Sequence, residues 1–322
     1  MYIGVDLGGT NIATGIVNEE GKLIYDDSVP TGKERNYKVI VNDIIDLINK
    51  IIKESGIEKE KIKAVGIGIP GIAEANTGRV IKCPNLNWSN IPLKQIMEDR
   101  LNIPVFIDND ATLAALAEHT AGSMKYVSSG VFITIGTGIG GGVILDGKIE
   151  AGFHGIGSEI GHMIVGKNYY NCGCGRNGCL ETFASSTALI SYTKRLIESG
   201  EKTVIIDKLR GNIEKLNGKL IFQAAKEGDP LANKAVNRMA KYLAVGIMNI
   251  VSIIDPEIFV LGGGISKAGD FLLNKIKEEV SRIKYYEGLP IGNIVLAKLG
   301  NEAGIIGAAI LGKLNLEKER KI

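Results

Sequence analysis

The amino-acid sequence predicts a duplicated α/β fold, in which two halves share one plan and leave a cleft between them. Three observations carry this prediction. A glycine-rich turn between two short apolar runs occurs at residues 8–10 and again at 136–142. In each half the turn is followed by a helical pattern, then by an apolar run that ends in glycine and by another that ends in polar residues. Finally, the segment 107–116 has an echo in 299–310, where Asn301-Glu302-Ala303 replaces Asn109-Asp110-Ala111.

The first half is justified by the spacing of its apolar residues. Isoleucine and valine recur at helical spacing from Ile40 to Ile52, which predicts an amphipathic helix. The unbroken apolar run from Ala64 to Ile69 predicts a buried strand. We therefore expect, in order, strands over 2–7 and 12–17, a helix over 36–54, a strand over 64–69, a helix over 92–101, a strand over 104–107 and a helix over 111–118.

The second half repeats this order and carries an insertion near residues 146–220. Its expected elements are strands over 131–135 and 143–145, a helix over 231–253, strands over 257–261 and 294–297, and a closing helix over 302–314. We expect a small N-terminal domain of residues 1–119, completed by the C-terminal helix at about 302–322. Residues 120–301 then form a larger domain.

Composition and charge exclude several classes of protein. The 322 residues are enough for two domains with full cores. Lys and Arg (38) nearly balance Asp and Glu (36) and are interspersed with them, so the basic face of a nucleic-acid binder is absent. The longest apolar stretch, residues 242–254, contains Asn249 and Ser252 and indicates a buried helix, not a membrane span. We expect a cytoplasmic protein without a leader, with reduced cysteines and no nucleic-acid or membrane partner.

Potential metal ligands gather in one short stretch. Three of the four cysteines and one of the three histidines lie between residues 162 and 179, namely His162, Cys172, Cys174 and Cys179. Thiolate and imidazole are preferred ligands of zinc, and a set with all four positions filled by protein is structural. The alternative is a pair of buried or redox cysteines in a loop. Glu159 and Glu181 stand just outside the ligands, so zinc would also fix two carboxylates.

The two glycine turns are candidate phosphate sites. Facing one another across a cleft, they would point backbone N–H groups at a common centre, and such nests bind phosphate. Thr10 and Thr137 add hydroxyl donors, and Asp6 is placed to hold Mg²⁺ through water. Taken singly, each turn is ordinary. The sequence contains no GxxxxGK[ST] motif, and residues 136–141 fit GxGxxG but continue as a strand, which disfavours a dinucleotide fold.

Carboxylates at the expected cleft provide further chemistry. Asn109 and Asp110 follow a strand at the sheet edge where α/β proteins bind ligands. Asp110 can accept a proton from a hydroxyl that attacks phosphorus, and a helix N-cap is the compatible structural alternative. Glu159 and Glu181 can each accept hydrogen bonds from sugar hydroxyls. Their structural alternative is a solvated surface charge.

These motifs resemble the ROK family (repressors, open reading frames and kinases), and within it the bacterial and archaeal glucokinases. The resemblance covers nearly the whole chain, and its glycine-histidine plus cysteine combination is highly specific. The matching segments are Asp6 to Thr10, Pro70-Gly71, Pro84 to Trp88, Asn109 to Ala111, Gly136 to Gly142, Glu159 to His162 and Cys172 to Glu181. Thr112 is a minor departure from the asparagine that the family often has there, and it bears on sugar preference.

The resemblance implies a ribonuclease H-like (actin–hexokinase) fold and ATP-dependent phosphorylation of a hexose, with Mg²⁺ and structural Zn²⁺. It places the catalytic base on Asp110. Sugar binding falls on Gly71, Asn109, Asp110, Glu159, His162 and Glu181. Nucleotide and Mg²⁺ binding falls on Asp6, Gly8, Gly9, Thr10, Asn11, Thr137, Gly138, Ile139, Gly140, Gly263 and Gly264. In this interpretation His162 uses one ring nitrogen for zinc and offers the other toward sugar.

We therefore expect a glucokinase that phosphorylates the 6-hydroxyl of glucose. A kinase of N-acetylmannosamine, of fructose or of several hexoses is the runner-up, and polyphosphate is an alternative donor. Repressors of the family carry a helix-turn-helix domain ahead of the first strand. A sugar-responsive regulator is therefore disfavoured, because the first strand here is expected to start at Ile3. A noncatalytic sugar-binding protein is disfavoured because Asp6 and Asp110 are intact. The helix over 231–253 suits either a core or a subunit interface, and a homo-oligomer (dimer or tetramer) is expected.

Overall fold

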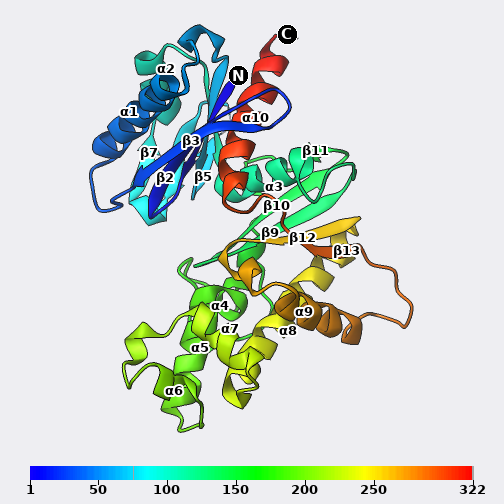
Figure 1. Ribbon diagram of the computed structural model, residues 1–322. Helices are drawn as coiled ribbons and strands as arrows, with labels where there is room; N and C mark the ends of the chain where they lie inside the picture. Colours follow the sequence, from blue (N-terminus) through cyan, green and yellow to red (C-terminus); the bar gives the residue numbers. More distant parts are fainter. Residues whose placement is uncertain (75, 321–322) are drawn as a thin grey trace. The chain divides into compact units, whose positions relative to one another are not determined.

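The computed structural model describes residues 1–74 and 76–320, which form two compact units (Figure 1). Unit 1 comprises residues 1–128 apart from residue 75, residues 142–158, and residues 298–320. Unit 2 comprises residues 129–141 and 159–297. Residues 142–158 thus group with unit 1, where the sequence analysis expected the larger domain, because strand β11 (Lys148–Ile149) packs against helix α3 (Asp110–Ala121).

Unit 1 is built on a five-stranded sheet with the strand order β3-β2-β1-β4-β8. Strands β1, β2 and β3 are successive antiparallel neighbours, whereas β4 pairs parallel to β1 and β8 parallel to β4. The bounds are β1 Tyr2–Leu7, β2 Asn11–Val17, β3 Leu23–Pro30, β4 Ala64–Ile69 and β8 Val105–Asn109. Parallel pairing of β1, β4 and β8 brings the carboxyl ends of these three strands to one edge of the sheet.

Helices cover both faces of this sheet and create two cores. Helices α1 (Tyr37–Ser55) and α2 (Leu93–Leu101) enclose one core with Ile3, Val5 and Leu7 of β1. Helices α3 and α10 (Ala303–Glu319) enclose the other, to which β1 contributes Tyr2. Two glycines let α10 approach the sheet closely, because a Cβ on Gly4 would lie 1.8 Å from the carbonyl oxygen of Ile305, and one on Gly66 would lie 1.7 Å from that of Ala308.

Unit 1 also contains a small antiparallel sheet. The small sheet has the order β5-β6-β7, with bounds Ile72–Glu74, Arg79–Cys83 and Trp88–Ile91.

One acidic residue lies inside unit 1. Glu118 of α3 is fully buried (0% exposed). Its carboxylate accepts backbone N–H groups from Ser123 at 2.6 Å and from Lys298 and Leu299 at 2.9 and 2.8 Å. Three donors on one carboxylate satisfy the buried charge.

The second five-stranded sheet has the order β11-β10-β9-β12-β13, which repeats the plan of the first. Strands β10 and β11 are antiparallel, and β12 pairs parallel to both β9 and β13. The bounds are β9 Gly130–Ile135, β10 Ile139–Leu145, β12 Ile258–Gly262 and β13 Asn293–Leu296. The boundary between the units falls within β10. The repeated strand order confirms the predicted duplication.

The helices of unit 2 are α4 (Glu181–Ala184), α5 (Ser186–Glu198), α6 (Ile205–Lys208), α7 (Gly218–Lys226), α8 (Pro230–Ile254) and α9 (Asp270–Arg282). Helix α8 packs against α4, α5, α7 and α9 and buries apolar residues on several faces. Short 3₁₀ turns complete the chain: η1 Lys59–Lys61, η2 Pro84–Leu86, η3 Ile160–His162, η4 Ile213–Lys215, η5 Gly264–Ala268 and η6 Gly300–Glu302. Among the described residues, no helix combines the length and the apolar character that crossing a membrane requires.

Most predicted elements are confirmed to within a few residues, and two differ in ways that affect the site. Helix α3 begins at Asp110, not at residue 111, because the side chain of Asn109 caps it. Strand β10 begins at Ile139, four residues before the predicted strand, so residues 139–142 lie in the sheet. The second glycine turn therefore consists of Gly136, Thr137 and Gly138.

Candidate active site

The first glycine turn joins β1 to β2 in unit 1. The N–H of Gly8 donates to the carbonyl of Asn11 at 2.9 Å, which closes the turn around Gly9 and Thr10. Two more bonds come from Thr31, which directly follows β3. Its hydroxyl donates to the Gly8 carbonyl at 2.7 Å, and its N–H donates to the Thr10 carbonyl at 2.8 Å.

Asp6 lies at the end of β1, next to this turn. It stands opposite Ala13 of β2 and Gly68 of β4, and its side chain is half-buried. Burial raises the pKa of the Asp6 carboxyl from 3.8 to about 6. The group is therefore ionised above about pH 6, as a ligand of a cation must be.

In protein free of Mg²⁺ and nucleotide, we expect Asp6→Asn to increase the free energy of unfolding at about pH 7.5. The pKa of Asp6 is higher in the folded than in the unfolded chain, so its contribution to stability falls as the pH rises from about 4 to about 6. Asparagine does not ionise, and the gain should be on the order of 2–3 kcal/mol at most.

Urea unfolding of wild type and variant at about pH 4 and about pH 7.5 checks this prediction, since the gain should vanish at the lower pH. Asp26→Asn, which changes an exposed carboxylate on β3, is the control. Equal unfolding free energies of wild type and Asp6→Asn at the higher pH would contradict the burial effect.

Gly71, Asn109 and Asp110 meet at the carboxyl ends of β4 and β8. The side-chain amide of Asn109 donates to the Gly71 carbonyl at 3.1 Å, and its oxygen accepts the N–H groups of Ala111 and Thr112 at 2.9 and 3.2 Å. Asn109, not Asp110, is thus the N-cap. Asp110 is half-buried in the first turn of α3, where the helix dipole favours a negative charge. Its carboxylate accepts the N–H of Ala111 at 2.8 Å.

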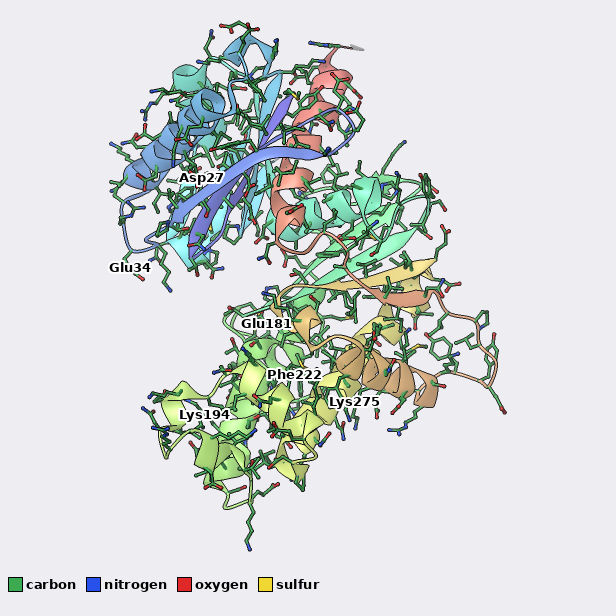
Figure 2. All side chains as sticks on the ribbon, in the orientation of Figure 1. Asp27, Glu34, Glu181, Lys194, Phe222 and Lys275 are labelled. Atoms are coloured by element: carbon green, nitrogen blue, oxygen red, sulfur yellow. The ribbon has the colours of Figure 1, made fainter. Side chains whose placement is uncertain are left out.

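The second glycine turn joins β9 to β10, and three bonds from outside hold it. The N–H of Ser186 donates to the Gly136 carbonyl at 2.8 Å, and the Thr187 hydroxyl donates to the Thr137 carbonyl at 2.7 Å. The carboxylate of Glu181 accepts the Ile139 N–H at 3.0 Å. Glu181, labelled in Figure 2, therefore contacts the end of the turn directly.

The cysteines and the histidine of the sequence motif do come together in unit 2. One ligand atom from each of His162, Cys172, Cys174 and Cys179 lies within 4.8 Å of the others. The Cys172 sulfur is 3.6 Å from His162 Nδ1, and the Cys174 and Cys179 sulfurs are 3.6 Å apart. A tetrahedral zinc ion would separate such atoms by about 3.5–3.8 Å. The donor set and its spacing therefore fit zinc.

Backbone contacts shape this cysteine cluster before any metal is considered. The N–H of Cys172 donates to the Arg176 carbonyl at 2.8 Å and that of Gly175 to the Cys172 carbonyl at 2.9 Å, which forms a tight knuckle. Gly178 has a φ of 95°, and a Cβ there would lie 1.9 Å from the Gly166 carbonyl oxygen. Hydrogen bonds from Arg176 lower the pKa of the Cys174 thiol to about 6, which favours the thiolate.

The carboxylates beside the cluster divide into two environments. Glu159 Oε2 is 4.0 Å from Nε2 of His162, the ring nitrogen that does not face the Cys172 sulfur. Glu181 begins α4, and its Oε1 lies 3.6 Å from the Cys172 sulfur. One oxygen of Glu181 thus faces the cluster while the other holds the glycine turn.

A cavity of about 1050 Å³ lies in unit 2 beside the second glycine turn. Gly136, Thr137 and Gly264 line it, and Gly263 directly precedes Gly264 with a φ of 80°. The sequence reasoning did not identify the remaining lining residues, Ser186, Gly218, Lys219, Phe222 (Figure 2), Gln223, Lys226, Glu227, Ile265, Lys267 and Ala268. They carry no motif, and only the helical spacing of residues 219, 222, 223 and 226 signals a shared face.

The structure thus groups the predicted site residues into two sets. Unit 1 brings together Asp6, Gly8, Gly9, Thr10, Asn11, Gly71, Asn109 and Asp110 at the strand ends of its main sheet. Unit 2 brings together Thr137, Gly138, Ile139, Gly140, Glu159, His162, Glu181, Gly263, Gly264 and the cysteines.

Two like sheets with a clamped glycine turn in each define a duplicated ribonuclease H-like protein of the actin–hexokinase class. The chain belongs to the ROK family, whose model matches residues 2–314.

Relatives within the family include both enzymes and regulators. The glucokinase of Streptomyces coelicolor is 36% identical over 316 residues, which is 97% of this chain and 98% of that one. The xylose repressor of Caldicellulosiruptor bescii is 33% identical over 95% of this chain and 76% of its own length. Among solved structures, the ROK glucokinase from Streptomyces griseus in complex with glucose and AMPPNP is 34% identical, with a TM-score of 0.85 over 97% of this chain and 99% of that one.

Proposed function

We propose that this protein is an ATP-dependent hexose kinase that transfers the γ-phosphate of MgATP to the 6-hydroxyl of glucose. The observation that carries the proposal is Asp110, held at the start of α3 beside Gly71 and Asn109. The similar glucokinases and the neighbour bound to glucose and AMPPNP support the same activity. A cytoplasmic location and a homo-oligomeric state belong to the proposal.

In this mechanism the sugar is held by Gly71, Asn109, Glu159, His162 and Glu181. Asp110 accepts the proton of the 6-hydroxyl as that oxygen attacks phosphorus. The backbone N–H groups of the two glycine turns receive the phosphate oxygens and stabilise the charge that develops on them. Asp6 would hold Mg²⁺ through water, and the cation supplies neutralisation of phosphate charge when bound. The cavity of unit 2, lined by Gly264, which directly follows Gly263 in the chain, accepts the nucleoside.

His162, Cys172, Cys174 and Cys179 would hold a structural zinc ion. Through Nδ1 facing the cluster, His162 would have its ring orientation fixed, which leaves Nε2 for Glu159 or a sugar hydroxyl. The Cys172 sulfur lies 3.6 Å from Glu181 Oε1, so the same cluster also contacts a second residue that would bind the sugar.

A coupled assay with MgATP over glucose, mannose, fructose and N-acetylmannosamine tests the proposal. The highest kcat/KM is expected with glucose. A clear preference for another sugar supports the runner-up, a kinase of N-acetylmannosamine, fructose or several hexoses. Polyphosphate in place of ATP tests the donor, as one structural neighbour is an inorganic polyphosphate/ATP-glucomannokinase. Sugar binding without any phosphorylation would overturn the kinase proposal and favour a regulator, the role that the xylose repressor's name gives that relative.

A further inference from the structure

Each of the two glycine turns is held from outside by one threonine hydroxyl and one backbone N–H. In unit 1 the Thr31 hydroxyl donates to the Gly8 carbonyl at 2.7 Å. In unit 2 the Thr187 hydroxyl donates to the Thr137 carbonyl, also at 2.7 Å. In each turn a backbone N–H from the same segment fixes a second carbonyl at 2.8 Å, from Thr31 to Thr10 and from Ser186 to Gly136.

These bonds determine where the N–H groups of the turns point. A peptide unit is planar, and its carbonyl and N–H point in opposite directions. Anchoring the Gly8 carbonyl therefore fixes the N–H of Gly9, and anchoring the Thr137 carbonyl fixes that of Gly138. With the Gly8 and Thr137 carbonyls engaged by threonines outside the turns, the N–H groups of Gly9 and Gly138 point away from those threonines. A nest for an anion needs this arrangement.

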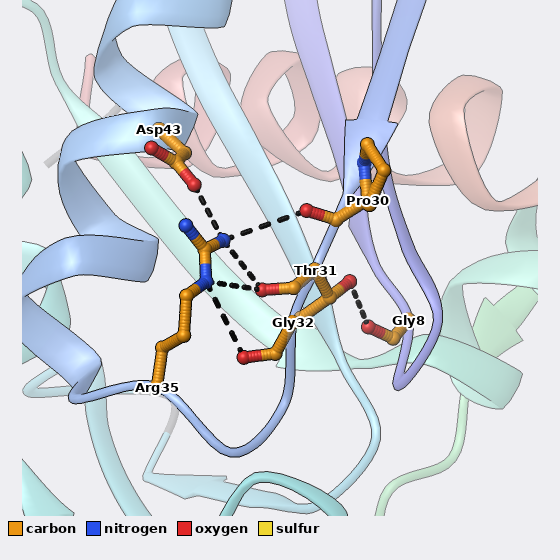
Figure 3. A network of polar contacts seen from close by, with 6 residues as sticks. All are labelled: Gly8, Pro30, Thr31, Gly32, Arg35 and Asp43. Carbon is orange, nitrogen blue, oxygen red and sulfur yellow. Dashed lines mark hydrogen bonds and ion pairs between the residues drawn. The ribbon is translucent and has the colours of Figure 1, made fainter.

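The anchor in unit 1 is itself braced by helix α1 (Figure 3). Arg35 donates from Nη2 to the Thr31 carbonyl at 2.6 Å and pairs with Asp43 of α1 at 2.5 Å. Its Nε also donates to the carbonyls of Thr31 and Gly32 at 3.3 and 3.4 Å. Thr31 is thus held between α1 and the glycine turn.

We propose that Thr31 and Thr187 are paired positioning residues, which hold the two glycine turns in the conformation that receives the phosphates of the donor. This inference rests on the proposed kinase function. The two anchors differ in burial, because Thr31 is fully buried whereas Thr187 is exposed. Water can replace the Thr187 hydroxyl but not that of Thr31, so removal of the Thr31 hydroxyl has the larger effect.

The first experiment measures the turn itself and needs no activity. Hydrogen exchange is compared in wild type, Thr31→Val and Thr31→Ser for two amides, that of Gly8, which is bonded to the Asn11 carbonyl, and that of Thr31, which is bonded to the Thr10 carbonyl. Exchange about tenfold faster in Thr31→Val, with Ser restoring protection, is expected. Thr193→Val is the matched control, since Thr193 is equally buried and its hydroxyl donates to the Leu189 carbonyl at 2.8 Å, within α5.

The second experiment measures ligand affinity. Thr31→Val should weaken AMPPNP binding and raise the KM for MgATP about tenfold, with glucose affinity unchanged, whereas Thr187→Val should change both by about twofold or less. Arg35→Met removes the contacts of an exposed side chain with Asp43 and with the Thr31 carbonyl, so it should also raise the KM for MgATP, by less than Thr31→Val does. This variant provides the test if Thr31→Val folds poorly. Thr193→Val should leave both values unchanged.

The two failures can be told apart. A wild type that binds no AMPPNP and phosphorylates no sugar would overturn the proposed function, and the exchange experiment would still decide whether Thr31 orders the turn. A wild type that binds AMPPNP, with Thr31→Val and Arg35→Met matching it in exchange and affinity, would overturn the positioning role. Equal losses of glucose and AMPPNP affinity would also overturn it, since they indicate a general structural effect.

Discussion

Asp110→Asn is expected to bind glucose with nearly unchanged affinity and to lose turnover by about 10²- to 10⁴-fold. The amide keeps the shape of the side chain and can still accept the Ala111 N–H, which Asp110 accepts at 2.8 Å. It cannot accept the proton of the sugar hydroxyl. Glucose affinity measured by titration calorimetry and kcat from the coupled assay separate these two effects.

Asp270→Asn provides a matched control for the loss of charge at a helix start. Asp270 is the first residue of α9, as Asp110 is the first residue of α3. Both variants lose the same favourable interaction with a helix dipole, so a kcat loss confined to Asp110→Asn assigns the effect to chemistry. Near wild-type kcat in Asp110→Asn would show that another group is the base.

Cys174→Ser is the second variant with a large expected effect. Wild-type protein should hold one zinc ion per chain, and the variant should lose it, because three ligands bind zinc much more weakly than four. Bound metal stabilises the folded state by about 4 kcal/mol at a thousandfold excess over its Kd, and the variant should lose a stabilisation of this order. Cys174 is the exposed cysteine of the cluster, so serine there adds no buried polar group.

Glucose affinity should fall with the loss of the zinc ion, by about tenfold or more, because His162 belongs to the cluster and Glu181 contacts it. Elemental analysis, thermal unfolding and the glucose KM are the measurements. Cys83→Ala should keep one zinc ion, since Cys83 lies in unit 1, outside the cluster. An unchanged glucose KM in metal-free Cys174→Ser would rule out the coupling of zinc to sugar.

The fold could be predicted where the sequence pattern is strong and local. Helix α1 and strand β4 follow directly from isoleucine spacing and from an unbroken apolar run. Strand β3 alternates in burial along its length but carries Asp26 and Asp27. It was therefore not predicted, because the prediction relied on apolar runs. The start of α3 was missed by one residue because Asn109 and Asp110 are both good caps, and only the contacts of Asn109 decide between them.

The candidate site was predictable where residues of unusual type lie close together in the sequence. The cysteine cluster is such a case. Thr31, Thr187 and Phe222 were not predictable, because a lone threonine or phenylalanine carries no signal until the fold brings it against a glycine turn or a cavity. The cleft between the halves and the roles of the individual site residues stay predictions.

Glu118 has a consequence for how the chain tolerates change over evolution. Its carboxylate accepts backbone N–H groups from Ser123, shortly before the chain first leaves unit 1, and from Lys298, where the chain returns to unit 1 for the last time. Unit 1 alone therefore holds its first exit point beside its last re-entry point. Loops within residues 159–297 can lengthen, shorten or be exchanged between relatives without disturbing that junction. Diversification of substrate choice should concentrate there, while the helix that carries Asp110 stays unaltered.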